Sequence, residues 1–154
     1  KIAKKYKLKI IEDNAESLGG KYKGKILGSI GDVSTLSFFA NKIITTGEGG
    51  AILTNSKKIA EKSQILRDHG MSKIKKYVHV DLGYNYRMTN MQAAIGLSQM
   101  EILKKILKKR NHQLFTYKKY LSSINQIKIR SFKNWCYPVH WLTTITLKKK
   151  KFKK

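Results

Sequence analysis

Three short apolar runs separated by glycine-containing turns constrain the fold of this chain more than any other feature. The runs cover residues 8–11, 33–39 and 50–54, each of a length typical of a strand and too short for an ordinary helix. Glycines at 19, 20, 28 and 31 break the chain between the first two runs, and GEGG separates the last two. The pattern predicts buried strands of an α/β sheet. Glu12 and Asp13 follow the first run, and in open α/β sheets that carboxyl edge is where ligands bind.

Helical signals follow the strands. Ser56 is placed to cap a helix over residues 57–68, and Thr89 and Gln92 have the spacing of a capping box. A longer helix is therefore predicted over residues 91–107, and we expect it to continue or restart through residue 120. Its apolar positions predict one broad stripe, made of Ala94, Ile95, Leu97, Ile102, Leu103 and Ile106. Residues 70–86, between the two helices, predict an irregular surface or interface loop.

Two further segments predict short β-structure. Residues 21–27 predict a small hairpin around Lys23 and Gly24. Residues 127–129 and 137–147 predict strands of a second unit. Trp135, Tyr137 and Trp141 alternate around Pro138, a pattern that favours a buried strand face over a base-stacking platform.

The net charge of +24 suggests an anionic partner, but the distribution of charge argues against nucleic acid. Only four of the 33 basic residues are arginines, and the lysines are scattered along the chain rather than gathered in one stripe. Residues 148–154 alone resemble a basic tail. Cys136 is the single cysteine, so no internal disulfide forms, which fits a reducing cytoplasm. No run approaches eighteen apolar residues, so no membrane span is predicted.

Lys42 is the lysine that the sequence singles out. It lies in LSFFANKIITTGEGG, between Phe39 and Ile43, and a lysine in apolar surroundings is costly unless its amine is neutral or bonded. Two functions fit such a lysine: a desolvated amine that forms a Schiff base, or an ammonium that binds phosphate. The structural alternative is a lysine whose stem lies along the core while its head reaches water.

Asp13 and Lys42 together suggest pyridoxal phosphate chemistry. That cofactor needs a lysine for an imine and an acid facing the pyridine nitrogen, so that the protonated ring withdraws electrons. Its phosphate needs hydroxyls and backbone amides, which Ser37, Thr45, Thr46 and the glycines at 47, 49 and 50 can supply. The alternative is that Asp13 caps a turn and the glycines only form one.

Other site classes have weaker support. Four histidines and Cys136 show no recognised zinc spacing, so no metal site is predicted; the histidines are His69, His79, His112 and His140. GEGG lacks both the GxGxxG spacing of dinucleotide sites and the GK[ST] ending of a P-loop.

Four separated motifs carry a family resemblance. IEDNAESLGGKYKGKILGSIGD, STLSFFANKIITTGEGGAILTN, LRDHGM and LGYNYRMTNMQAAIGLSQME resemble, in order and spacing, the DegT-type nucleotide-sugar aminotransferases, which are pyridoxal phosphate enzymes of fold type I. FFANK, TTGEGG and GYNYRMTN look closest to the perosamine synthase branch, which aminates carbon 4 of GDP-4-keto-6-deoxymannose for cell-surface polysaccharide such as O-antigen. An alternative within the family is the same reaction on a UDP- or dTDP-linked keto sugar.

The resemblance implies roles for five residues. Lys42 matches the lysine that bonds the cofactor and then shuttles a proton, and Asp13 matches the acid that pairs with the pyridine nitrogen. Glu16 stands beside the cofactor's ring oxygen, and Ser37 matches the hydroxyl that binds the phosphate. Asn85 matches a segment that reaches the phosphate in the partner subunit's site, where Arg87 is an alternative donor. Glutamate as amino donor, a homodimer with shared sites and a cytoplasmic location are implied with them.

The resemblance also implies the architecture. Residues 1–107 correspond to the latter half of a large, mostly parallel cofactor-binding domain, and residues 108–154 to a connecting helix and the start of a small C-terminal α/β domain. Family members are more than twice this length, and the preceding segment normally supplies a phosphate turn and an aromatic stacked on the ring. We therefore expect a piece of a longer protein with uncovered apolar surfaces. The alternatives are a catalytically silent fragment and, more remotely, a basic nucleic-acid-binding protein.

Overall fold

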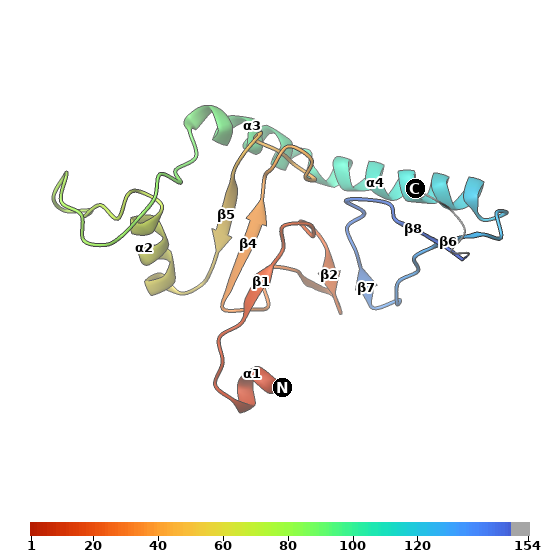
Figure 1. Cartoon of the computed structure of the whole chain (residues 1–154), viewed down its shortest axis with the longest axis horizontal. Helices are drawn as coiled ribbons and strands as arrows, with labels where there is room; N and C mark the ends of the chain where they lie inside the picture. The colour runs from red at the N-terminus through yellow and green to blue at the C-terminus, as the bar shows by residue number, and fades with distance from the viewer. Residues whose placement is uncertain (149–154) are drawn as a thin grey trace.

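The computed structural model describes residues 1–148 and centres on a three-stranded sheet (Figure 1). The strands are β1 (Ile11–Asp13), β4 (Val33–Ser37) and β5 (Gly50–Leu53), in the order β1-β4-β5. β1 and β4 are parallel, with Asp13 opposite Thr35, whereas β4 and β5 are antiparallel, with Ser37 opposite Gly50. The described sheet is therefore mixed, and the predicted mostly parallel sheet is not confirmed. The reason is local: Phe38 N donates to Gly49 O at 2.9 Å, so the chain re-enters the sheet beside the strand it has just left.

The first strand starts later than predicted. Residues 8–10 lie outside it, and Glu12 and Asp13 belong to β1 itself rather than following it. Asp32 explains the shift, because its backbone N–H donates to Ile10 O at 2.9 Å and its carboxylate accepts from Ile10 N at 2.9 Å. Strand pairing begins only at Ile11, opposite Val33. Asp13 still ends its strand at the predicted carboxyl edge.

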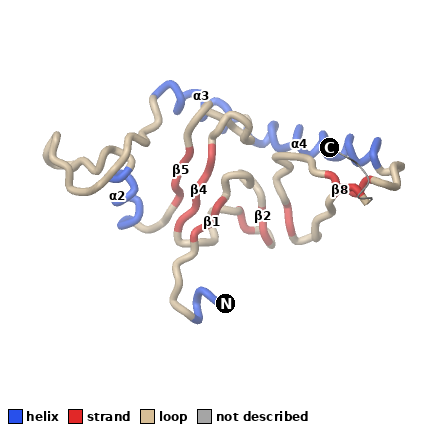
Figure 2. The backbone as a smooth tube through the Cα atoms, in the orientation of Figure 1, coloured by secondary structure: helices blue, strands red, loops and turns tan. Residues whose placement is uncertain are grey.

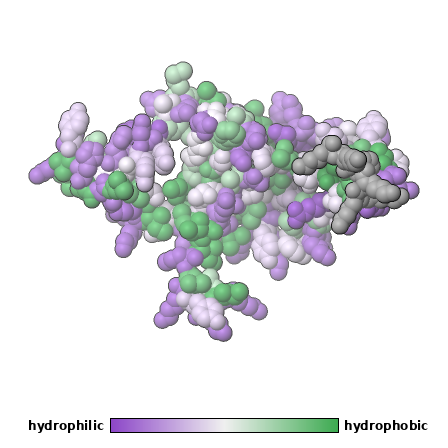
Figure 3. Space-filling view, in the orientation of Figure 1, coloured by the Kyte–Doolittle hydropathy of each residue, from purple (hydrophilic) through white to green (hydrophobic). Residues whose placement is uncertain are grey.

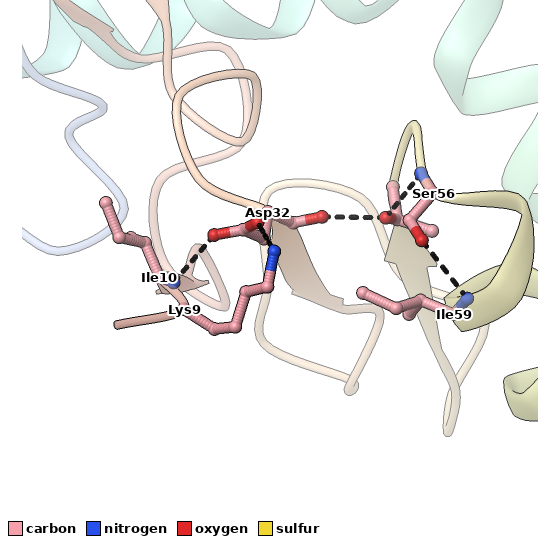
Figure 4. A network of polar contacts seen from close by, with 6 residues as sticks. Lys9, Ile10, Asp32, Ser56 and Ile59 are labelled. Carbon is pink, nitrogen blue, oxygen red and sulfur yellow. Dashed lines mark hydrogen bonds and ion pairs between the residues drawn. The ribbon is translucent and has the colours of Figure 1, made fainter. Parts of the chain in front are cut away.

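A hydrogen-bond network around Asp32 links the strands at the opposite end of this sheet, where β1 and β4 begin (Figure 4). The carboxylate of Asp32 accepts from Lys9 Nζ at 2.7 Å, and its backbone carbonyl accepts from Thr54 Oγ1 at 2.7 Å. Thr54 Oγ1 in turn accepts from Ser56 N at 3.1 Å. The hydrogen bond from Lys9, with that from Ile10 N, lowers the pKa of the Asp32 carboxyl. The network joins the entry to β1, the start of β4 and the end of β5.

The predicted hairpin forms and gains a third strand. β2 (Lys21–Tyr22) pairs with β3 (Lys25–Ile26), and Lys23 and Gly24 adopt φ values of 47° and 80°, as a tight two-residue hairpin turn requires. β2 also pairs with β7 (Cys136–Tyr137), which brings the C-terminal segment back to the N-terminal part.

The single strand predicted over residues 137–147 is wrong. The segment divides into β7 and β8 (Ile145–Leu147), and β8 pairs with β6 (Ile127–Ile129) in a separate sheet. Pro138 has no N–H to donate, so a strand ends readily before it. The predicted buried face is also wrong, since Trp135 is 46% and Tyr137 50% exposed.

The helices over residues 90–101 and 103–121 follow one another along one side of the molecule (Figure 2). α2 (Lys57–Leu66) begins at the predicted Ser56 cap, and α3 (Asn90–Glu101) begins at the complete capping box of Thr89 and Gln92. The chain breaks at Ile102 and restarts as α4 (Leu103–Leu121). A four-residue helix, α1 (Ile2–Lys5), was not predicted. α4 runs unbroken through residues 107 and 108, so the predicted domain boundary stays a prediction.

Little apolar surface is buried. Ile43, Ile44 and Leu114 are the buried hydrophobic residues of the described chain. Much of the apolar stripe predicted for α3 lies open, with Ile95 51% and Leu97 63% exposed, and Figure 3 shows apolar side chains spread over the visible face. The expected uncovered apolar surface is therefore present. Within residues 1–148, no helix combines the length and apolar character needed to cross a bilayer. The basic run from residue 149 onward lies outside the described residues.

Candidate active site

Lys42 lies on a closed loop between β4 and β5. The two ends of the loop meet at Phe38, whose N–H donates to Gly49 O and whose carbonyl accepts from Thr46 N, both at 2.9 Å. Ile43 and Ile44 follow the lysine and are only 6% and 1% exposed. The apolar run after Lys42 therefore anchors the loop, which fixes where the lysine emerges.

Helix α3 holds the same loop from outside. Gln99 accepts from Thr45 N at 3.0 Å and donates to Thr45 O at 2.7 Å, so one side chain satisfies both backbone groups of a loop residue. Gly96 is buried against Thr46, and a β-carbon at position 96 would lie 3.0 Å from Thr46 Cγ2. Sequence reasoning missed Gln99. A glutamine between apolar positions of a helix is nevertheless a signal, because a polar side chain on a packed face needs a hydrogen-bond partner.

The amine of Lys42 has two partners. Nζ lies 3.6 Å from Glu16 Oε1 and 4.1 Å from the centroid of the Trp141 ring, and the lysine side chain is only 13% exposed. The indole N–H of Trp141 donates to Asn41 O at 2.6 Å. The structure therefore disfavours a lysine whose head extends into open water. It brings together Lys42 and Glu16, two of the predicted site residues. Trp141 was assigned to a strand, and its contact with Lys42 was missed.

Glu16 is carried by a double turn anchored to the sheet. Ser17 N donates to Asn14 O at 3.1 Å, and Gly20 N donates to Ser17 O at 2.8 Å. Asn14 is buried and donates through Nδ2 to Ser34 Oγ at 2.7 Å, which ties the turns to β4. The loop thus presents Glu16 at the edge of the sheet where β4 ends.

Asp13 and Ser37 share one face of the sheet. Asp13 is opposite Thr35, and Ser37 lies two residues further along β4, so side chains at these positions point the same way. Asp13 Oδ1 accepts from Ala15 N at 3.0 Å, and Ser37 Oγ accepts from Phe39 N at 3.3 Å. Asp13 therefore also caps the turn that follows it, which is the structural role considered as the alternative to cofactor binding. An exposed carboxylate and a hydroxyl stand along one edge, at the start of the loop that carries Lys42.

Glu12, the other half of the acidic pair, has a structural role on the opposite face. Its carboxylate accepts from the backbone N–H groups of Gly28, Ile30 and Gly31 at 2.9, 2.7 and 2.5 Å. Burial raises the pKa of the Glu12 carboxyl, but these N–H donors together outweigh burial and hold the pKa below its ordinary value. Of the two acids, Asp13 is thus the exposed one.

The threonines proposed as phosphate ligands are used within the loop. Thr45 Oγ1 donates to Phe38 O at 3.1 Å and accepts from Gly47 N at 2.9 Å, while Thr46 Oγ1 donates to Glu48 O at 2.6 Å. Gly47 and Gly49 adopt φ values of +81° and +139°, which favour glycine. These contacts support the turn interpretation for this part of the motif and leave Ser37 as the better phosphate candidate.

Asn85 lies elsewhere in this chain. It lines a hollow of about 710 Å³ together with Gly49, Gly50 and Arg87, whereas Lys42, Asp13 and Ser37 do not line it. Asn85 forms a β-bridge with Asp68, and Arg87 donates to the carboxylate of Asp68 at 3.3 Å. The structure does not bring Asn85 to Lys42 within one chain. Among residues 1–148, no group of three or more histidine, cysteine or acidic residues is placed to hold a metal ion.

Comparison with known proteins identifies the relatives of this arrangement. Residues 1–154 match the DegT/DnrJ/EryC1/StrS aminotransferase family. GDP-perosamine synthase of Escherichia coli O157:H7 is 42% identical over 144 residues, which cover 94% of this chain and 39% of that protein. UDP-4-amino-4,6-dideoxy-N-acetyl-beta-L-altrosamine transaminase of Campylobacter jejuni is 39% identical over 137 residues, which cover 86% of this chain and 36% of that protein.

Solved structures agree with the sequence relatives. Helicobacter pylori PseC, an aminotransferase involved in the biosynthesis of pseudoaminic acid, superposes with a TM-score of 0.88 at 31% identity, over 97% of this chain and 41% of that one. This chain therefore spans about two fifths of the length of the relatives it matches.

Proposed function

Since the chain belongs to the DegT/DnrJ/EryC1/StrS aminotransferase family, whose enzymes depend on pyridoxal phosphate, we propose that it forms part of a nucleotide-sugar aminotransferase. The observation that supports this most directly is the placement of Lys42. Its amine is shielded on a loop closed by hydrogen bonds, beside the sheet edge that presents Asp13 and Ser37. An amine, a carboxylate and a hydroxyl are among the groups that this cofactor requires.

Each residue has a proposed task. Lys42 would hold the cofactor through its amine, and the same amine, once released, would carry a proton for the transfer. Asp13 keeps the pyridine nitrogen protonated, because a nearby negative charge favours the cationic ring. Ser37 would bind the phosphate, and Glu16 would face the ring oxygen. When bound, the cofactor serves as an electron sink that stabilises negative charge on the substrate carbon.

Asn85 is proposed to act in a second subunit of a homodimer. Asn85 and Arg87 line a hollow that Lys42 of the same chain does not line. This placement supports a role for Asn85 in the cofactor site of the other subunit. Because Arg87 is engaged with Asp68, Asn85 is the freer of the two proposed phosphate donors.

The proposed reaction transfers an amino group from glutamate to a GDP-linked 4-keto-6-deoxy sugar, in the cytoplasm. The E. coli relative supports the GDP-linked sugar. The alternative is a UDP-linked keto sugar, which the C. jejuni relative favours. A comparison of the two nucleotides as inhibitors of cofactor-dependent amination by the whole enzyme distinguishes these substrates.

The first test is reductive trapping. The purified chain is titrated with pyridoxal phosphate, reduced with borohydride and mapped by peptide mass spectrometry. The proposal expects selective labelling of Lys42 that disappears in Lys42→Ala and persists in Lys23→Ala, a matched control because Lys23 also lies near aromatic rings. Scattered labelling of surface lysines, equal in all three proteins, would instead support the silent fragment.

A further inference from the structure

Trp141 contacts two consecutive residues of the lysine loop. Its indole N–H donates to Asn41 O at 2.6 Å, and its ring lies 4.1 Å from Lys42 Nζ. The hydrogen bond to Asn41 fixes the indole ring of Trp141 relative to the loop backbone. It therefore also fixes the ring face that lies against the ammonium of Lys42. A flat aromatic face attracts a cation at this distance, most strongly when the pair is shielded from water.

The two partners of Lys42 differ in how firmly they hold the amine. Glu16 is 60% exposed, and its 3.6 Å separation from Nζ is long for a hydrogen-bonded ion pair. Solvent and salt screen such a pair strongly. Trp141 is half-buried and held by its own hydrogen bond, so it is the more persistent partner.

A second lysine of the chain shows that this contact is unusual. Lys23 Nζ lies 5.7 Å from the ring of Tyr22 and 6.0 Å from the ring of Trp135, and Lys23 is exposed. Lys42 is closer to its ring and only 13% exposed. The chain therefore offers two lysine–tryptophan contacts for comparison. Trp141 covers the proposed cofactor lysine, whereas Trp135 lies beside the exposed Lys23.

We propose that Trp141 is a positioning residue, which holds the amine of Lys42 in place and shields it from solvent before the cofactor binds. This inference rests on the proposed function. Trp141 comes from the segment between β7 and β8, so the C-terminal part of the chain helps to build a site whose other residues lie on β1, β4 and their loops.

The test begins without cofactor. The chain and its variants are pulsed with a limiting amine-reactive reagent, and the modification rate of every lysine is read by mass spectrometry. Trp141→Ala is expected to raise the rate at Lys42 about three- to tenfold, the range of a partly shielded cation–π contact, and to leave the other lysines unchanged. Trp141→Phe retains an aromatic face and is expected to restore most of the protection. Trp135→Ala is the control and is expected to change nothing at Lys42.

A spectroscopic measurement covers the case in which Trp141→Ala does not fold. In a Trp135→Phe background, Trp141 is the single indole, and Lys42→Met is expected to change its emission intensity because the adjacent ammonium is lost. Unchanged emission, or a Lys42 modification rate in folded Trp141→Ala within twofold of the parent, overturns the positioning role.

A final arm separates this inference from the proposed function. With limiting pyridoxal phosphate and borohydride, labelling depends on how the amine is positioned toward a bound aldehyde and not only on how accessible the amine is. The share of label on Lys42 is therefore expected to fall in Trp141→Ala and recover in Trp141→Phe. An equal share in the parent and folded Trp141→Ala contradicts the inference alone. If the parent shows no selective label at Lys42, the cofactor assignment fails, while the cofactor-free rates still decide whether Trp141 holds the lysine.

Discussion

Gln99 of α3 binds both backbone groups of Thr45, accepting from its N–H at 3.0 Å and donating to its carbonyl at 2.7 Å. Thr45 lies three residues after Lys42, on the same closed loop. Gln99 therefore ties the helix to the loop that carries the proposed cofactor lysine.

Replacement of Gln99 by alanine is expected to loosen this loop. Two hydrogen bonds are lost, worth about 1 kcal/mol each in a partly buried setting. Amide hydrogen exchange at Thr45 should accelerate by one to two orders of magnitude, as a loss of about 2 kcal/mol implies. Gln113→Ala, on exposed α4, is the matched control. Equal exchange at Thr45 in the two variants would show that Gln99 does not hold the loop.

Glu12→Gln is expected to lower stability at neutral pH and to flatten its dependence on acid. The folded state lowers the pKa of Glu12, so its contribution is present above the ordinary value of 4.5 and is lost as the pH falls from there through the folded pKa. Loss of charge-assisted hydrogen bonds to three N–H groups should cost about 1.5–3 kcal/mol in urea unfolding at pH 7.

The control for Glu12 is Glu101→Gln, a change at an exposed position in the last turn of α3. That variant should keep the parent's steep loss of stability below pH 4.5. If Glu12→Gln keeps the same slope as the parent, the three backbone contacts do not carry the effect.

Thr89→Ala is expected to fray the start of α3. The variant removes the side-chain oxygen that accepts from Gln92 N, and a lost cap of this kind costs about 1 kcal/mol. Thr89→Ser should retain most of the helix, since its hydroxyl reaches the same donor. Amide exchange over residues 90–93 distinguishes the two variants, and comparable exchange in both would contradict the capping role.

Asp13→Asn is expected to weaken binding of pyridoxal phosphate about tenfold or more, because the ring nitrogen loses its anionic partner. The fold should persist, since the amide oxygen of asparagine can still accept from Ala15 N. Binding is followed by the cofactor's absorbance. Asp81→Asn, which removes a carboxylate paired with Lys62, should bind as the parent does. Unchanged affinity in Asp13→Asn would place the pyridine nitrogen elsewhere.

Prediction from the sequence succeeded where the decisive contacts are short in range. The capping box of Thr89 and Gln92, the Ser56 cap and the hairpin at Lys23 and Gly24 each join residues at most five apart. Such contacts leave a recognisable spacing in the chain.

Prediction failed where distant residues compete for the same backbone. Asp32 forms hydrogen bonds with both backbone groups of Ile10, so β1 begins one residue after it, at Ile11. The mixed sheet follows from the hydrogen bond between Phe38 and Gly49, which closes the loop. The apolar stripe of α3 is largely open because burial depends on what packs against a helix, and periodicity describes only the helix itself.

The sequence by itself determined the local helices and turns. Through its motifs it also determined the family, and it singled out Lys42 as the candidate cofactor lysine. Only the tertiary structure decided that Lys42 lies between Glu16 and Trp141, and that Gln99 holds its loop. Trp141 and Asn41 are 100 residues apart, and their hydrogen bond depends on how the whole intervening chain folds back. A contact of that kind arises from chain path and packing, so no spacing along the sequence records it.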